Sequence, residues 1–216
     1  MKTSSRNTWG AVGALLVSLF VVGWASVASA EGESAFGPRT EVSLMGGIQA
    51  LNKNDTALPD RFLNVPAVGA LAYRLTSRLA AEGEFTWMIP VKQSVDVGSG
   101  TNQDRKTPDI LAYQANLRAD FPVSALTPYV VAGAGAVTFL SNTDPDRLPQ
   151  LPKSETAFAV NFGGGVTYGL TENWSVRGDL REFVAFPKDG AAGLSNSTGA
   201  DQIWMERGTV GLLYRF

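Results

Sequence analysis

Ten charged residues alternate with apolar residues along this chain, and they are the side chains best placed to do chemistry. They comprise five carboxylates and five guanidinium groups: Glu41, Arg74, Glu82, Glu84, Arg118, Asp120, Arg177, Asp179, Arg181 and Arg207. Glu82 and Glu84 lie two residues apart, so a strand would present both on one face, and a carboxylate pair can supply a general acid and a base. The accompanying arginines make ion pairing the simpler role. We therefore expect a structural network of charges, with a gate or a narrow ion path as the alternative.

The sequence contains no histidine and no cysteine. This excludes serine hydrolases with a histidine base, histidine-dependent acid–base catalysis and histidine-containing zinc sites, and it excludes a disulfide-stapled fold. Only a carboxylate pair or a serine–lysine set would leave room for an enzyme. We expect no enzyme activity and no cofactor. Asp55 and the pair Asp144-x-Asp146 could hold a cation, but they lack a complete acidic loop pattern.

The first thirty residues have the three parts of a secretory signal peptide. Lys2 and Arg6 form a basic region, residues 11–25 are apolar, and Ala28-Ser29-Ala30 gives a small-x-small cleavage pattern. A retained transmembrane anchor is the alternative, because the apolar run approaches the length of a short span. The polar residues that follow favour cleavage near Ala30, which leaves one mature domain at 31–216.

Cleavage would remove two basic residues and no acidic ones. The count would pass from 18 bases and 20 acids to 16 and 20, a net charge of −4. Nucleic-acid binding needs a basic surface, so we expect no nucleic-acid partner.

The remaining chain shows the period-two alternation of β-strands. Eight strands are predicted, at residues 39–51, 65–76, 79–89, 108–121, 128–140, 156–170, 174–186 and 203–216. Four long polar connections, at 52–64, 90–107, 141–155 and 187–202, alternate with short turns. Strands of about 10–14 residues and this alternation of connections are typical of membrane barrels. No segment after the leader is long and apolar enough for a transmembrane helix, so membrane insertion would require a barrel.

Aromatic residues gather near both ends of one face of the predicted strands. One rim would carry Tyr73, Phe121, Tyr129, Tyr168, Trp174, Tyr214 and Phe216, and the other Trp87, Phe139, Phe158, Phe186 and Trp204. Two aromatic girdles around an aliphatic band are expected at the two surfaces of a bilayer. Aromatic clustering at the ends of an ordinary barrel core is the alternative. Glu182 shares this face, so it would lie at headgroup level unless a β-bulge near Arg181 shifts it.

Three segments carry a resemblance to a known family. Thr209, Gly211, Tyr214 and Phe216 occupy a polar-x-Gly-x-x-aromatic-x-aromatic pattern, which resembles the C-terminal assembly signal of bacterial outer-membrane barrels. The Pro128–Gly135 segment and the glycine-rich Asn161–Tyr168 segment resemble strands of small OmpA/OmpX-like outer-membrane proteins. The resemblance implies an all-β fold, an eight-stranded antiparallel up-and-down transmembrane β-barrel, assembled through its last strand by the barrel-assembly machinery.

The resemblance also places the protein in the bacterial outer membrane, in contact with lipid, and we expect a monomer. We expect a structural or surface-interaction role through extracellular loops that meet an unknown ligand. A narrow porin or small-solute channel is the first alternative. A soluble, lipocalin-like periplasmic carrier is the second.

Overall fold

The computed structural model describes residues 40–52, 61–96, 102–147, 151–187 and 202–216. These residues all belong to the compact unit Phe36–Phe216. The predicted leader, the Asp55 candidate and parts of the four long connections lie outside the described residues. No helix in the described part of the chain is long and apolar enough to cross a membrane.

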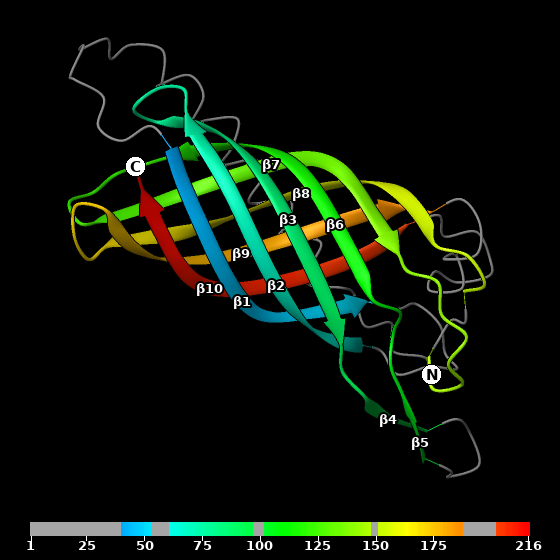
Figure 1. The fold of residues 1–216 in the computed structure, drawn as a ribbon. Coiled ribbons are helices and arrows are strands. Elements are labelled where there is room, and N and C mark those ends of the chain that lie inside the picture. The colour runs from blue at the N-terminus through cyan, green and yellow to red at the C-terminus, as the bar shows by residue number, and fades with distance from the viewer. Residues whose placement is uncertain (1–39, 53–60, 97–101, 148–150, 188–201) are drawn as a thin grey trace, which may run out of the picture. The chain divides into compact units, whose positions relative to one another are not determined.

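Eight strands form one closed antiparallel barrel in the order β1-β10-β9-β8-β7-β6-β3-β2 (Figure 1). The barrel strands are β1 (Thr40–Asn52), β2 (Arg61–Arg74), β3 (Leu79–Pro90), β6 (Ile110–Asp120), β7 (Leu126–Phe139), β8 (Glu155–Gly169), β9 (Trp174–Phe186) and β10 (Ile203–Arg215). Each strand pairs with its neighbours in sequence, and the ladder between β1 and β10 closes the barrel. The predicted eight-stranded antiparallel up-and-down barrel is confirmed.

The connections differ in length at the two ends of the barrel. One end, here called the turn end, carries the short turns at residues 75–78, 121–125 and 170–173 and the paired residues Glu41 and Arg215. The hydroxyls of Thr76 and Thr171 stabilise two of these turns by accepting backbone hydrogen bonds from Leu79 and Trp174, at 2.9 and 3.0 Å. The opposite end, the loop end, carries the long connections.

One long connection contains structure that the sequence pattern does not indicate. Within residues 90–107, predicted as a polar loop, strands β4 (Gln93–Asp96) and β5 (Asn102–Arg105) form a separate two-stranded sheet (Figure 1). Neither strand alternates apolar and polar residues, so no period-two signal marks it. Strand β2 likewise begins at Arg61, four residues before the predicted start, because its ladder with β1 continues to Asn52.

The faces of the barrel wall are inverted relative to a soluble barrel. On β3, Glu82, Glu84 and Thr86 are at most 5% exposed, whereas Phe85 and Trp87 are 44% and 45% exposed. Apolar residues outside and polar residues inside are the arrangement of a membrane barrel. Inward polar residues also mark β1, β6, β8, β9 and β10, whereas the described inward side chains of β2 and β7 are mainly apolar.

Strand β7 corrects two of the predicted girdle residues. Tyr129 and Phe139, placed on the outer face by the sequence analysis, are 3% and 0% exposed and point into the lumen. Directly paired residues of neighbouring strands share a face, and Tyr129 pairs with the inward-facing Asp120. Both faces of β7 are apolar, so alternation alone could not decide which was which, and assigning the larger side chains to lipid was wrong.

Glu182 faces outward without any bulge. The one-to-one register of β9 with β8 and with β10 runs unbroken through Arg181 and Glu182, so the bulge alternative is wrong. Glu182 is half-buried and lies directly opposite Glu206 of β10 on the same outer face.

Two inward-facing glycines are required by close approaches in the wall. A Cβ on Gly165 would lie 2.4 Å from the hydroxyl oxygen of Tyr129, so this glycine makes room for the ring. A Cβ on Gly211 would lie 2.0 Å from the carbonyl oxygen of Leu44 in β1. Gly211 therefore lets β10 approach the first strand where the barrel closes.

We expect Gly211→Ala to lower the free energy of unfolding by about 1–3 kcal/mol, because the added methyl group overpacks the closing ladder. Gly178→Ala is the matched control, since its Cβ would meet only a Val166 methyl group at 4.0 Å. Urea unfolding in detergent micelles and heat-modifiability gels would measure both variants. Equal unfolding midpoints for the two would contradict the proposed close approach.

Candidate functional site

The ten charged residues predicted to share one face all point into the barrel lumen. Nine of them are at most 5% exposed, and Arg74 is half-buried at the turn end. An isolated buried charge is costly, so buried ions require partners. The lumen is therefore the place to ask what these residues do.

At the turn end, Glu41 is the centre of the first group of ion pairs. It accepts hydrogen bonds from Arg74 at 2.9 Å, from Arg215 at 3.1 Å and from Arg118. Asp120 binds Arg118 at 2.8 Å and Arg74 at 3.4 Å. Arg215 is an eleventh member, beyond the ten predicted residues. Its phase relative to inward-facing Thr209 is the signal that could have identified it.

Toward the middle of the lumen, a second group joins β3 to β9 and β10. Glu82 accepts hydrogen bonds from Arg177 and Arg181, each at 2.7 Å. Asp179 binds Arg181 at 2.9 Å and lies 3.3 Å from both Arg177 and Arg207. The two groups are continuous, because Glu82 also lies 3.5 Å from Arg118.

Glu84 completes the second group at its boundary with the loop-end half of the lumen. It accepts a hydrogen bond from Arg207 at 2.7 Å and lies 3.1 Å from Arg181. The connected set thus contains five carboxylates and six guanidinium groups, drawn from β1, β2, β3, β6, β9 and β10. We call it the charge network.

Tyr129 belongs to this network rather than to the outer surface. Its hydroxyl donates to Asp179 at 2.6 Å and accepts from Nε of Arg177 at 2.8 Å. The guanidinium carbon of Arg177 lies 4.8 Å from the ring centroid, within cation–π distance. Tyr129 therefore brings β7 into the same set of contacts.

The loop-end half of the lumen is filled by apolar side chains from all eight barrel strands and one loop. This apolar plug comprises Leu51, Phe62, Met88, Ile110, Ala112, Val137, Phe139, Leu151, Ala157, Ala159, Phe183, Ala185, Ile203 and Met205. Each is at most 3% exposed. Leu151 comes from the connection between β7 and β8, where its carbonyl accepts a hydrogen bond from the backbone of Asn142 at 2.8 Å.

The charge network has little capacity for catalysis. Each of its carboxylates has at least two arginine partners within 3.5 Å. A general base must be free to take a proton from substrate, and the Glu82–Glu84 pair is held by Arg177, Arg181 and Arg207. Within the described ranges, no group of three or more metal-ligating side chains is assembled.

The two cation candidates within the described residues, Asp144 and Asp146, are paired with cationic side chains. Asp146 lies 3.2 Å from Lys92 and 3.5 Å from Lys106, and Asp144 lies 3.2 Å from Arg147. The pKa of the Asp146 carboxyl lies below its ordinary value, because burial raises it less than the two lysines lower it. These contacts give both aspartates a role within the loops.

The four residues of the predicted assembly signal divide between the two faces of β10. Thr209 and Gly211 face the lumen side, and Tyr214 and Phe216 face outward. The Tyr214 ring lies 4.8 Å from those of Trp174 and Phe216, measured between centroids. The backbone N–H of Phe216 donates to the carbonyl of Thr40 at 2.9 Å, which extends the closing ladder by one hydrogen bond.

The sequence matches a known protein family, and the barrel resembles several solved structures. The family model for the outer membrane protein beta-barrel domain matches residues 16–216. The crystal structure of Neisserial surface protein A is similar at a TM-score of 0.54 and 14% identity, over 82% of this chain and 97% of that one. The crystal structure of Ail of Yersinia pestis aligns with a TM-score of 0.48 and 12% sequence identity, over 84% of this chain and 100% of that one. The crystal structure of OprG of Pseudomonas aeruginosa aligns with a TM-score of 0.43 and 15% sequence identity, over 83% of this chain and 97% of that one. No curated protein sequence matches this chain.

We expect Tyr129→Phe to lower the free energy of unfolding by about 1–3 kcal/mol, because it leaves a buried carboxylate and a buried guanidinium each without one hydrogen-bond partner. Tyr113→Phe is the matched control, because Tyr113 lies on the outer face of the barrel and is 45% exposed. Denaturant unfolding of both variants would show whether loss of the Tyr129 hydroxyl costs more stability than loss of the Tyr113 hydroxyl on the outer face. Equal and small changes in the free energy of unfolding would contradict the placement of Tyr129 in the lumen.

Proposed function

The chain belongs to the outer membrane protein beta-barrel domain family, and on that premise we propose that it is a closed outer-membrane barrel that acts through its loops. In such barrels short turns face the periplasm and long loops face outside. The turn end would therefore be periplasmic, and the loop end extracellular. The inverted faces of the wall match a bilayer and do not suit the soluble carrier alternative.

The filled lumen is the observation that supports a closed barrel over a channel. An eight-stranded barrel has an interior just wide enough for its side chains, and here the apolar plug occupies one half while the charge network occupies the other. Ions would have to cross a region lined by buried Phe62, Phe139 and Phe183, where the described polar side chains Asn64 and Thr107 are hydrogen-bonded to each other at 2.9 Å. We assign the arginines and carboxylates to holding the wall together.

The loop end supports a role in surface interaction, because its described loops hold one another. The backbone N–H of Lys106 donates to the carbonyl of Asp146 at 2.9 Å, and Arg105 donates to the carbonyl of Pro145 at 3.0 Å. Arg147 also binds Asp109 at 2.8 Å. The β4–β5 hairpin is thus fixed to the β7–β8 connection. A surface fixed in advance loses less conformational freedom on binding.

We further propose that the barrel is a monomer in contact with outer-membrane lipid, that its last strand is the segment engaged by the assembly machinery, and that it is not an enzyme. The extracellular ligand is of unknown chemistry.

Purified protein in planar bilayers should show no conductance steps above background at neutral pH. The packed plug gives the physical reason, and a porin reconstituted in parallel would show that insertion and detection work. Stable openings that disappear in Arg118→Gln or Arg177→Gln would favour the narrow channel instead.

Replacing residues 93–105 by a short glycine–serine linker should leave the barrel folded and abolish adhesion. Cells that display the protein would be compared with cells lacking it on three coated surfaces, one positively charged, one negatively charged and one uncharged. Gly178→Ala, displayed to the same level, is the control. Retention no greater than that of cells lacking the protein, on all three surfaces, would count against an adhesive role.

A further inference from the structure

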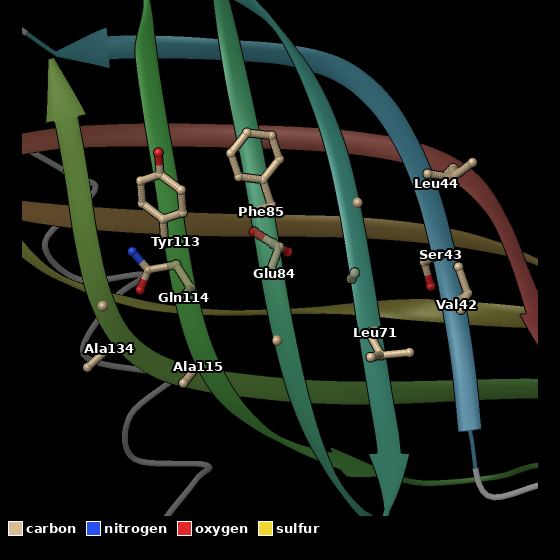
Figure 2. A pocket seen from close by; sticks show the side chains of 14 residues that line it. Val42, Ser43, Leu44, Leu71, Glu84, Phe85, Tyr113, Gln114, Ala115 and Ala134 are labelled. Carbon is tan, nitrogen blue, oxygen red and sulfur yellow. The ribbon is translucent and has the colours of Figure 1, made fainter. Parts of the chain in front are cut away.

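A shallow groove crosses the outer face of the barrel over β1, β2, β3, β6 and β7 (Figure 2). Its volume is about 730 Å³, within the range of about 300–1,000 Å³ of sites that hold one small molecule. Leu44, Leu71, Phe85 and Tyr113 stand around it, and all four are exposed on the outer face. The groove is therefore an apolar hollow on the surface that meets the bilayer.

Small residues create the hollow. Gly83 of β3, Ala115 of β6 and Ala134 of β7 are direct partners in one cross-strand row. In the adjacent row, Gly69 pairs with Phe85. Inward-pointing Glu84 also lines the groove, so the hollow reaches down to the backbone of the wall. The ring centroids of Phe85 and Tyr113 lie 5.5 Å apart, and the two rings form one side of the hollow.

A second groove adjoins this hollow on the β10 side of β1, toward the turn end. It is lined by Trp174, Leu212 and Tyr214, has a volume of about 300 Å³, and shares Val42 and Leu44 with the first groove. Trp174 and Tyr214 are the aromatic residues expected at the level of the headgroups. Val42 and Leu44 therefore stand between the two grooves, and the adjoining grooves, together called the path, extend from the turn-end rim toward the middle of the apolar band.

We propose that this path binds one acyl chain of a phospholipid from the periplasmic leaflet, with the headgroup beside Trp174 and Tyr214. The path begins at the turn end, which is the periplasmic rim, and it carries apolar residues along its length. Glycine and alanine leave backbone atoms of the barrel wall exposed at the bottom of the hollow. These atoms make dispersion contacts only with a slender apolar group that fits into the hollow. An acyl chain is the slender apolar molecule that the surrounding bilayer supplies. The proposal rests on the orientation of the barrel but is independent of whether the lumen conducts or the loops bind.

Photocrosslinking tests the site on the unaltered protein. The barrel would be reconstituted in nanodiscs with phosphatidylethanolamine carrying a diazirine in one acyl chain, irradiated, and mapped by peptide mass spectrometry. We expect labelling of β2, β3 and β6 peptides to exceed that of β8 peptides, which contribute no residue to either groove, by at least severalfold. Equal labelling around the barrel would overturn the proposal.

Filling the hollow supplies the second arm of the test. Gly69→Leu with Gly83→Leu should bring labelling of these peptides down to the level of the rest of the surface, and a Cβ at either position meets nothing closer than 3.9 Å. Gly178→Leu, on the outer face of β9, is the matched control and should leave the labelling unchanged. Native mass spectrometry of the unaltered protein should show one retained phospholipid on a single chain. A dimer that the filled variant abolishes would instead identify the groove as a contact between copies of the chain.

Discussion

The structure depends on the requirement that every charge sealed inside an eight-stranded wall must have a partner. Removing one member of a buried pair leaves an uncompensated ion, which is far more costly than losing an exposed pair. The ladder between β9 and β10 adds to this requirement, because it makes Arg181 and Arg207, which have like charges, direct cross-strand neighbours. Asp179 and Glu84 each contact both arginines, which turns a repulsive neighbour pair into the link between β3, β9 and β10.

The division of the lumen into a charged half and an apolar half has an energetic logic. Coulombic attraction between two ions grows as the surrounding dielectric constant falls. The apolar plug covers the network on the loop side, while Arg74 and Arg215 keep partial access to water at the turn end. The pairs around Glu82 and Asp179, whose side chains are fully buried, lie between these two boundaries. Packing and electrostatics therefore support each other in one small interior.

Seven of the eight strands could be assigned to their faces from sequence because inward polar residues mark the phase, as Glu82 and Glu84 do on β3. Strand β7 offers no such mark, and Tyr129 and Phe139 were consequently placed outside. The β4–β5 pair could not be predicted because neither Gln93–Asp96 nor Asn102–Arg105 alternates apolar and polar residues. The partners of each charge could not be read from the sequence either, since they depend on how the strands stagger around the lumen.

The ladder that closes the barrel joins the first and last described strands, and its Arg215–Glu41 contact spans 174 residues of sequence. Contacts between residues so far apart incur the largest loop-closure entropy and form slowly. Every other barrel ladder joins strands that follow one another and can form as hairpins. Until β10 reaches β1, both strands present an open edge of unpaired backbone groups, which is a template for pairing with another chain. Kinetically, this is a protein that is vulnerable to misassembly until its last strand is in place.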